Sequence, residues 1–364
     1  MFDDCLIMAG GSGTRLWPAS SSRLPKQFLP AYGKTSFFSM AVERALALTK
    51  NNGNVIVIAG KSHVPHVIAD TARLSAGRRK RLVVIGEPAA KNTAPAVACA
   101  VSYSLLNGAG RNMLVLTSDH IIKPPEAFRA DATLAACAAA KGKLVVFGIP
   151  PARPETGYGY IETGRTVDGV SRVTAFHEKP DPRTAKKYAA GKRFFWNSGM
   201  FAFSVESMAG LFRDLAPKVI LPFARLGTPS VTETDGVRVL ESWPGLAAAY
   251  RKTESISFDY AIAEKCPDTV MVRAGFDWID IGNWEEYVRI RGSGKTQVFG
   301  ASGDGCHVDS DIPVALAGVE DLIVVIRSGR DGGPPVALVT RKGQTQRVRE
   351  VVDMIRESGR TDLL

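Results

Sequence analysis

Residues 10–16 read Gly-Gly-Ser-Gly-Thr-Arg-Leu and directly follow an apolar run at residues 5–9. Glycines let a backbone pass close to an anion and turn successive N–H groups toward it. The segment is therefore a candidate phosphate-binding loop, with an ordinary tight turn as the alternative. Its candidate nucleotide-binding residues are Gly10, Gly11, Ser12, Gly13 and Thr14.

Two common phosphate-binding motifs do not describe this loop. A dinucleotide-binding fingerprint would need glycine at Leu16, and Pro18 with three serines interrupts the helix that should follow. A P-loop that ends in the Gly-Lys-Thr of residues 33–35 would need glycine where Phe28 stands. The loop therefore indicates a nucleotide site of another kind.

Two cations follow the glycines, Arg15 and Lys26. When a phosphate oxygen attacks the α-phosphorus of a triphosphate and pyrophosphate leaves, negative charge grows on the phosphate oxygens, and fixed cations stabilise it. We predict a catalytic role for both residues. The alternative is a pair of solvated surface cations.

Two aspartates follow apolar runs that have the length of buried strands. Asp119 comes after residues 113–117, and Asp280 comes after residues 276–279. Open α/β sheets bind ligands at the carboxyl ends of their strands, and paired carboxylates together with substrate phosphates suit Mg²⁺. Asp277 is a rival ligand, and a turn or helix cap is the alternative for either aspartate.

The pattern of apolar residues predicts the elements that position these groups. Short apolar runs alternate with helical patterns up to about residue 150, which indicates an α/β fold with a mostly parallel sheet covered by helices. Glycine- and aromatic-rich segments after residue 150 predict an antiparallel insertion that flanks a cleft. We place a catalytic domain at residues 1–290 and a small C-terminal β-rich domain, ending in a helix over residues 344–356, at residues 291–364.

Composition narrows the class of protein. The chain has 364 residues, 45% of them hydrophobic, and a formal net charge of +10. Only residues 78–81 form a tight basic run, so we expect small polyanionic substrates and no nucleic acid. The five cysteines are widely spaced, which predicts neither disulfides nor a zinc site. An acidic start and the lack of a long apolar run predict a cytoplasmic protein without a membrane span.

A series of short motifs stands in order along residues 5–290. The motifs are AGGSGTRLWP at residues 9–18, PKQFL at 25–29, EP at 87–88 with KNTAP at 91–95, SDH at 118–120, PETGYGYI at 154–161, EKP at 178–180, WNSGMF at 196–201 and DIGNW at 280–284. The ordered series resembles the mannose-1-phosphate guanylyltransferases, a branch of the sugar-nucleotide pyrophosphorylase family. His177 and Lys91 depart from the family pattern without removing a reacting group.

The resemblance implies a Rossmann-like sheet of the nucleotide-diphospho-sugar transferase type and assigns Mg²⁺ to Asp119 and Asp280. Glu87 offers two acceptor oxygens to the ring N–H and amino group of guanine. Thr93 has a second interpretation, as the N-cap of the helix that follows it. Beyond Glu87, the nucleotide site is expected to include Asn92, Thr93 and Ser118, and the sugar-phosphate site Tyr158, Gly159, Glu178, Lys179, Asn197 and Ser198.

The activity expected from this resemblance is transfer of GMP from GTP to α-D-mannose 1-phosphate, which gives GDP-mannose and pyrophosphate. The substrate phosphate is already ionised, so neither a covalent intermediate nor a general base is expected. The partners expected are these two substrates, with a homodimer as one possible assembly and no isomerase activity. The alternatives are an enzyme that uses glucose 1-phosphate with ATP or dTTP, and a non-catalytic nucleotide-sugar sensor.

Overall fold

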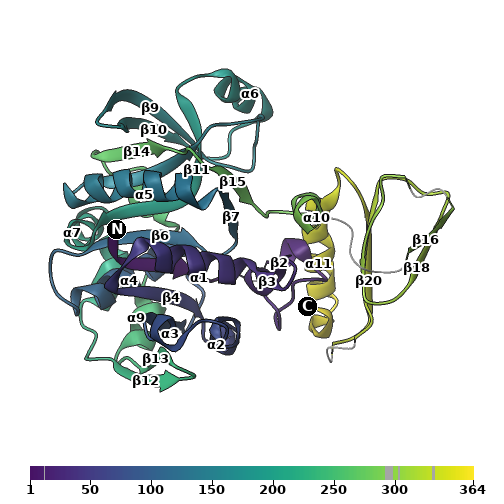
Figure 1. Ribbon diagram of the computed structural model, residues 1–364, viewed down its shortest axis with the longest axis horizontal. Helices are drawn as coiled ribbons and strands as arrows, with labels where there is room; N and C mark the ends of the chain where they lie inside the picture. Colours follow the sequence, from purple (N-terminus) through teal and green to yellow (C-terminus); the bar gives the residue numbers. More distant parts are fainter. Residues whose placement is uncertain (12, 292–297, 302–303, 330–332) are drawn as a thin grey trace. The chain divides into compact units, whose positions relative to one another are not determined.

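The computed structural model describes residues 1–11, 13–291, 298–301, 304–329 and 333–364. Two compact units emerge from the contacts within the chain (Figure 1). The larger unit comprises residues 1–10, 41–118 and 122–278, and the smaller unit comprises residues 11–40, 119–121 and 279–364. The glycine-rich loop after residue 10 thus groups with C-terminal residues, whereas the sequence predicted one continuous catalytic domain over residues 1–290.

An eleven-stranded sheet organises the described part of the larger unit, in the order β12-β13-β5-β4-β1-β6-β11-β8-β14-β10-β9. Pairing is parallel from β13 to β6 and again between β8 and β14, and β11 is antiparallel to both of its neighbours β6 and β8. The strands are β1 (Phe2–Met8), β4 (Thr49–Gly60), β5 (Leu82–Glu87), β6 (Asn112–Thr117), β8 (Leu144–Ile149), β9 (Tyr160–Val167), β10 (Val170–His177), β11 (Phe194–Ser204), β12 (Ser230–Thr234), β13 (Val237–Ser242) and β14 (Thr269–Arg273).

Helices cover this sheet because its parallel strands are apolar on both faces. One face packs against α4, α7 and α8 through a core that includes Leu6, Val97 and Phe212. Helix α5 packs through Phe128, whose ring lies 5.7 Å from that of Phe147 in β8. The helices are α1 (Phe37–Leu48), α2 (Val64–Thr71), α3 (Ala76–Arg79), α4 (Thr93–Leu105), α5 (Pro125–Ala140), α6 (Pro182–Ala190), α7 (Val205–Leu215), α8 (Pro217–Ile220), α9 (Leu246–Lys252) and a π-helix (Asp259–Ala263).

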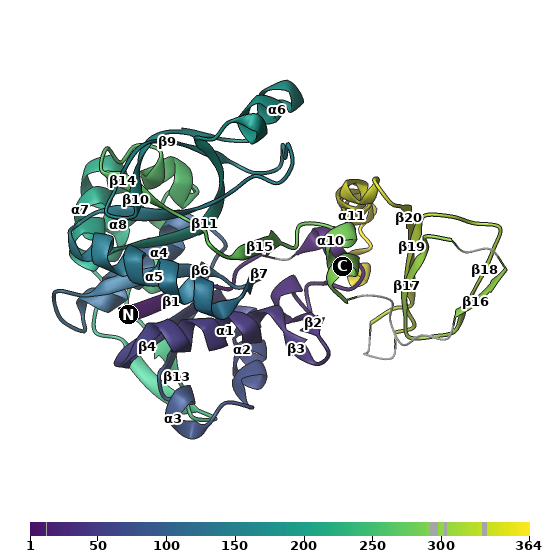
Figure 2. The same cartoon turned by 45° about the horizontal axis from the view of Figure 1, so that its top comes forward.

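The predicted α/β fold is confirmed, and strands β1 and β6 overlap the apolar runs at residues 5–9 and 113–117. Antiparallel strands follow residue 150, as predicted. Strands β9 and β10 form an antiparallel pair at the edge of the main sheet, where β10 also pairs with β14 (Figure 2).

The smaller unit has its own core, built from the turn after the glycine loop and from C-terminal elements. Leu16, Trp284 and Val352 are buried together in it. Short β-strands at the predicted C-terminal positions confirm the small β-rich part, and a 3₁₀ turn leads into the last helix. The elements are β2 (Pro30–Tyr32), β3 (Thr35–Ser36), α10 (Trp284–Arg291), β16 (Val298–Ala301), β17 (His307–Ser310), β18 (Val314–Ala317), β19 (Leu322–Arg327), β20 (Val336–Arg341) and α11 (Val348–Glu357).

Candidate active site

The glycine loop of the smaller unit packs directly on Lys26. Gly13 has φ of +62°, and a Cβ added to it would lie 2.3 Å from the Cβ of Lys26. The hydroxyl of Ser20 donates a hydrogen bond of 2.6 Å to the carbonyl of Gly13 and holds the turn. Only glycine fits this position, both for its backbone angle and for its space. Gly11 has φ of +99°, Thr14 is half-buried, and Ser12 lies outside the described residues.

Lys26 brings the two predicted metal ligands together. Its Nζ lies 2.8 Å from Asp119 Oδ2 and 3.5 Å from Asp280 Oδ1, and it also donates to the carbonyl of Ile281. Asp119 directly precedes β7 (His120–Lys123), Asp280 ends β15 (Asp277–Asp280), and these two strands pair with each other. Residues distant in sequence thus meet in one group of charges.

The charges in this group stabilise one another. Lys26 is only 7% exposed, and burial alone would lower its pKa, but the carboxylates of Asp119 and Asp280 outweigh burial and raise it. Burial alone would likewise raise the pKa of Asp119, yet Lys26 and then His120 lower it to about 2. Both groups are therefore charged at neutral pH.

His120 joins this group, although no role was predicted for it. Its Nε2 lies 3.9 Å from Asp119 Oδ1 and 3.9 Å from Asp280 Oδ1. Two ligands of one ion, each bound at about 2.0–2.2 Å, lie at most roughly 4.4 Å apart, so the imidazole is close enough to share a cation with either carboxylate. The only available signal was its place next to Asp119 in the Ser-Asp-His motif. Asp277, the predicted rival ligand, is exposed and belongs to the larger unit.

The donor set fits a divalent cation. Asp119, His120 and Asp280 form the one group among the described residues whose ligand atoms all lie within 4.8 Å of one another. Carboxylate oxygens are the ligands that Mg²⁺ prefers, whereas an imidazole is more typical of transition metals. Such an ion would be held by Asp119 and Asp280, with His120 beside them.

Arg15 lies near the same group. Its side chain is exposed, and its Nη1 lies 3.5 Å from the position that a Cβ on Gly282 would take. Its positive charge opposes protonation of Lys26 and so offsets part of the rise in the pKa of that lysine. The two predicted catalytic cations are therefore electrostatic neighbours.

Glu87, the predicted base-recognising residue, ends β5 in the larger unit. The hydroxyl of the fully buried Tyr250 donates a hydrogen bond of 2.9 Å to Glu87 Oε1. A Cβ on Gly10 would lie 3.7 Å from Glu87 Oε2, so this carboxylate faces the start of the glycine loop. Burial raises the pKa of Glu87 to about 7, although the bond from Tyr250 opposes the rise. Tyr250 has no motif around it that could have predicted this contact.

Asn92 and Thr93 begin α4 differently from the prediction. The side-chain oxygen of Asn92 accepts the N–H of Thr93 at 2.9 Å, and Asn92 itself has φ of +69°. The hydroxyl of Thr93 accepts the N–H of Phe258 at 2.8 Å. The N-cap interpretation of Thr93 was therefore wrong, because Asn92 caps the helix. Ser118, also predicted to bind nucleotide, is buried, and its N–H donates to the carbonyl of Met8 at 3.2 Å.

Four predicted sugar-phosphate residues meet in the larger unit. The N–H of Asn197 donates to the carbonyl of Gly159 at 2.8 Å, and a Cβ on Gly159 would lie 2.7 Å from Glu178 Oε2. Lys179 forms an ion pair of 2.9 Å with Glu178, at a strained φ of +40°. The side-chain amide of Asn197 donates a hydrogen bond of 2.6 Å to Asp259 Oδ1. Asp259 was not among the residues predicted from the sequence.

The two other predicted sugar-site residues, Tyr158 and Ser198, make packing and backbone contacts within the protein. The ring of Tyr158 packs edge-on against the rings of Trp196 and Trp278, at 5.4 and 5.2 Å. Ser198 is buried, and its hydroxyl accepts the N–H of Met200 at 3.3 Å.

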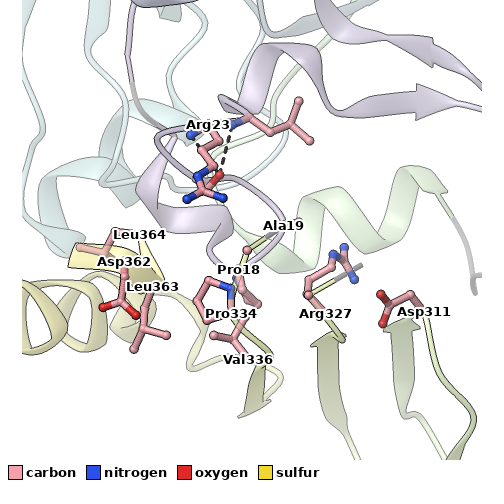
Figure 3. Close-up of a pocket in the computed structure, with 14 residues that line it drawn as sticks. Pro18, Ala19, Arg23, Asp311, Arg327, Pro334, Val336, Asp362, Leu363 and Leu364 are labelled. Atoms are coloured by element: carbon pink, nitrogen blue, oxygen red, sulfur yellow. Dashed lines mark hydrogen bonds between the residues drawn. The ribbon is translucent and has the colours of Figure 1, made fainter. Parts of the chain in front are cut away.

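Three cavities in the described part of the chain have linings that contain none of the predicted site residues. Cavities of about 450 and 420 Å³ in the larger unit are lined by residues outside the predicted set. A cavity of about 160 Å³ in the smaller unit lies between Pro18, Arg327 and the last residues of the chain (Figure 3). Arg327 pairs there with Asp309 at 3.1 Å, and the cavity is smaller than the roughly 300 Å³ at which ligand pockets begin.

Fold and site together define an α/β protein in which a glycine turn packs on a buried lysine, and this lysine pairs with two aspartates. Residues 4–219 match the family model described as nucleotidyl transferase. The chain belongs to the nucleotidyl transferase family of enzymes, which confirms the resemblance seen in its motifs. None of the described helices is long and apolar enough to cross a membrane.

Individual relatives match nearly the whole chain. It is 33% identical to a mannose-1-phosphate guanylyltransferase of Escherichia coli, over 98% of this chain and 74% of that protein. It is 34% identical to the xanthan biosynthesis protein XanB of Xanthomonas campestris pv. campestris, with the same coverage. The solved structure of a mannose-1-phosphate geranyltransferase from Thermus thermophilus has a TM-score of 0.78 and 30% identity, over 97% of this chain and 99% of that one.

Proposed function

We propose that this enzyme is a mannose-1-phosphate guanylyltransferase, which transfers GMP from GTP to α-D-mannose 1-phosphate and releases pyrophosphate. The observation that carries the proposal is the buried Lys26 between Asp119 and Asp280, next to the glycine turn. The relatives named for this activity at 32–34% identity support the choice of substrates. We also propose a cytoplasmic location for this activity, as the sequence predicts.

The mechanism needs no nucleophile from the protein. A phosphate oxygen of the sugar 1-phosphate attacks the α-phosphorus of GTP, and the bond to the β-phosphate oxygen breaks as pyrophosphate leaves. Lys26 and Arg15 stabilise the negative charge that grows on the phosphate oxygens, and the loop backbone orients the triphosphate. When bound at Asp119 and Asp280, Mg²⁺ supplies further positive charge at the same oxygens.

Selection of substrates is assigned to the larger unit. Ionised Glu87 accepts the N–H groups of guanine, which adenine cannot offer in the same pattern. Gly159, Glu178 and Asn197 bind the sugar hydroxyl groups, because carboxylates and amides provide the directed hydrogen bonds that sugars require. Lys179 binds the sugar phosphate after its pair with Glu178 rearranges.

The experiment that tests the proposal is a grid of pyrophosphate-release assays with Mg²⁺. Four nucleoside triphosphates are combined with the 1-phosphates of mannose, glucose and N-acetylglucosamine. We expect GTP with mannose 1-phosphate to give the highest kcat/KM. A preference for glucose 1-phosphate with ATP or dTTP would replace the substrates and keep the mechanism, and no turnover with any pair would favour the nucleotide-sugar sensor.

A further inference from the structure

We propose that Asp259 is a positioning residue of the sugar-phosphate site, which holds the Asn197 amide beside Glu178 and so determines which sugar hydroxyls are accepted. The inference rests on the proposed function, because it assigns the sugar site to Gly159, Glu178 and Asn197. No motif used to predict the site contains Asp259.

The Asn197 side chain is held at both ends of its amide. Its Nδ2 donates to Asp259 Oδ1 at 2.6 Å, and its Oδ1 accepts the N–H of Gly199 at 3.1 Å. A hydrogen bond to an ionised acceptor is shorter and about twice as strong as a neutral one. One N–H and one lone pair of the amide remain for a ligand. Asp259 therefore determines how Asn197 presents its remaining polar atoms.

The amide that Asp259 holds lies beside the other predicted sugar-site residues. The backbone of Asn197 donates to the carbonyl of Gly159 at 2.8 Å. A Cβ added to Gly159 would lie 2.7 Å from Glu178 Oε2 and 3.8 Å from the Cβ of Asn197. The backbone contact fixes where Asn197 starts, and Asp259 fixes the direction of its side-chain amide next to Glu178.

The surroundings of Asp259 favour a role at a binding site. Its side chain is half-buried, and desolvation together with the negative charge of Glu178 raises its pKa, while Asn197 opposes the rise. Asp259 also starts the π-helix Asp259–Ala263, and π-helical turns are frequent at functional sites. Lys179, which pairs with Glu178, holds a strained φ of +40°. Backbone strain of this kind clusters at sites that bind ligands.

Two substitutions of Asp259 distinguish a role in positioning Asn197 from a general role in folding. Asp259→Asn keeps an acceptor for Asn197 but loses the charge, and Asp259→Ala removes the acceptor. We expect KM for mannose 1-phosphate to rise about tenfold in Asp259→Asn and further in Asp259→Ala, with KM for GTP within about twofold of wild type. The preference for mannose 1-phosphate over glucose 1-phosphate should fall in the same order. Asp268→Asn, at an exposed carboxylate paired with Lys143, is the matched control.

The measurements are initial rates with each substrate varied in turn, and thermal unfolding of every variant. An unchanged KM for mannose 1-phosphate in both Asp259 variants of an active enzyme would overturn the inference and leave the proposed function standing. Equal increases in both KM values, with a lowered unfolding temperature, would also overturn it, since that pattern indicates damage to the fold. A wild-type enzyme inactive with every sugar 1-phosphate would overturn the proposed function and this inference with it.

Discussion

Glu87 lies in a position suited to base recognition, and its pKa is near neutral. Its carboxylate receives a hydrogen bond from Tyr250 and faces Gly10, and burial raises its pKa to about 7. Only the ionised form can accept both N–H groups of guanine. We therefore expect nucleotide binding by Glu87 to depend on pH in a range where most carboxylates are fully charged.

We expect KM for GTP to rise as the pH falls from 8 to 6, by up to about tenfold, because the ionised fraction of Glu87 drops from roughly nine-tenths to one-tenth. KM for ATP should not follow this trend. Initial rates with both nucleotides across this pH range test the prediction. The Glu87→Gln variant should lose both the pH trend and the preference for GTP; if it keeps them, another residue selects the base.

The same raised pKa predicts how stability changes with pH. Glu87 holds its proton in the folded protein up to a pKa of about 7, against about 4.5 for an unperturbed glutamate. The contribution of the neutral group to stability is fully present below about pH 4.5 and is lost as the pH rises through 7. Glu87→Gln should therefore gain unfolding temperature relative to wild type between pH 5 and pH 8. A constant difference across that range would argue against a raised pKa.

Lys26 is the cation that we expect catalysis to depend on most. Lys26→Ala leaves Asp119 and Asp280 without the ammonium group between them, and kcat should fall by about 100-fold or more. Circular dichroism should still show a folded protein. Lys34→Ala, at an exposed lysine of the same unit, is the control and should retain wild-type turnover. Near-normal turnover of Lys26→Ala would refute the catalytic role.

At the scale of elements, the turn that starts at Gly13 positions Lys26. Gly13 and Gly33 have similar positive φ angles, +62° and +56°, but only an added Cβ on Gly13 would meet Lys26, whereas nothing lies within 4 Å of one on Gly33. Substitutions at the two glycines therefore distinguish the effect of backbone strain from the effect of displacing Lys26.

Gly13→Ala should lower kcat by about tenfold or more, because the new Cβ displaces the lysine on which turnover depends. Gly33→Ala should lose only about 1 kcal/mol of stability from its backbone strain and retain turnover. Steady-state rates and thermal unfolding of both variants make the comparison. Equal losses of activity would show that strain alone, and not contact with Lys26, explains the effect.

At the scale of the whole molecule, the last described residues of the chain lie against the segment that follows the glycine loop. The indole N–H of Trp17 donates to the carbonyl of Leu363 at 2.7 Å, and the hydroxyl of Ser22 donates to the main-chain oxygen of Leu364 at 2.6 Å. Trp17 is buried in the same core as Trp284 and Val352 of the C-terminal region. The C-terminal residues therefore support the loop from within the smaller unit.

Removal of residues 361–364 should loosen this support. We expect the unfolding temperature to fall by a few degrees, as for loss of one or two hydrogen bonds of about 1 kcal/mol each, and KM for GTP to rise. Trp17→Phe, which removes only the indole donor, should show a smaller effect in the same direction. Calorimetry and GTP titration measure the two effects. A truncated protein that matches wild type in both would show that the C-terminal residues do not support the loop.

The sequence by itself determined the fold class and the ordered motifs. Strands in a parallel sheet are buried on both faces, so their apolar runs are visible without any knowledge of their partners. We could predict roles for Gly13, Lys26, Asp119 and Asp280 because phosphate and metal chemistry restricts residue types so strongly.

Only the tertiary structure decided which residues share a site. Contacts between residues far apart in the sequence place His120, Tyr250 and Asp259 beside predicted site residues, and no local pattern records such contacts. The grouping of the glycine loop with C-terminal residues was likewise hidden, because an apolar pattern shows that a face is buried but not what covers it. The same holds for the pKa of Glu87, since burial is a property of the folded chain and not of the residue.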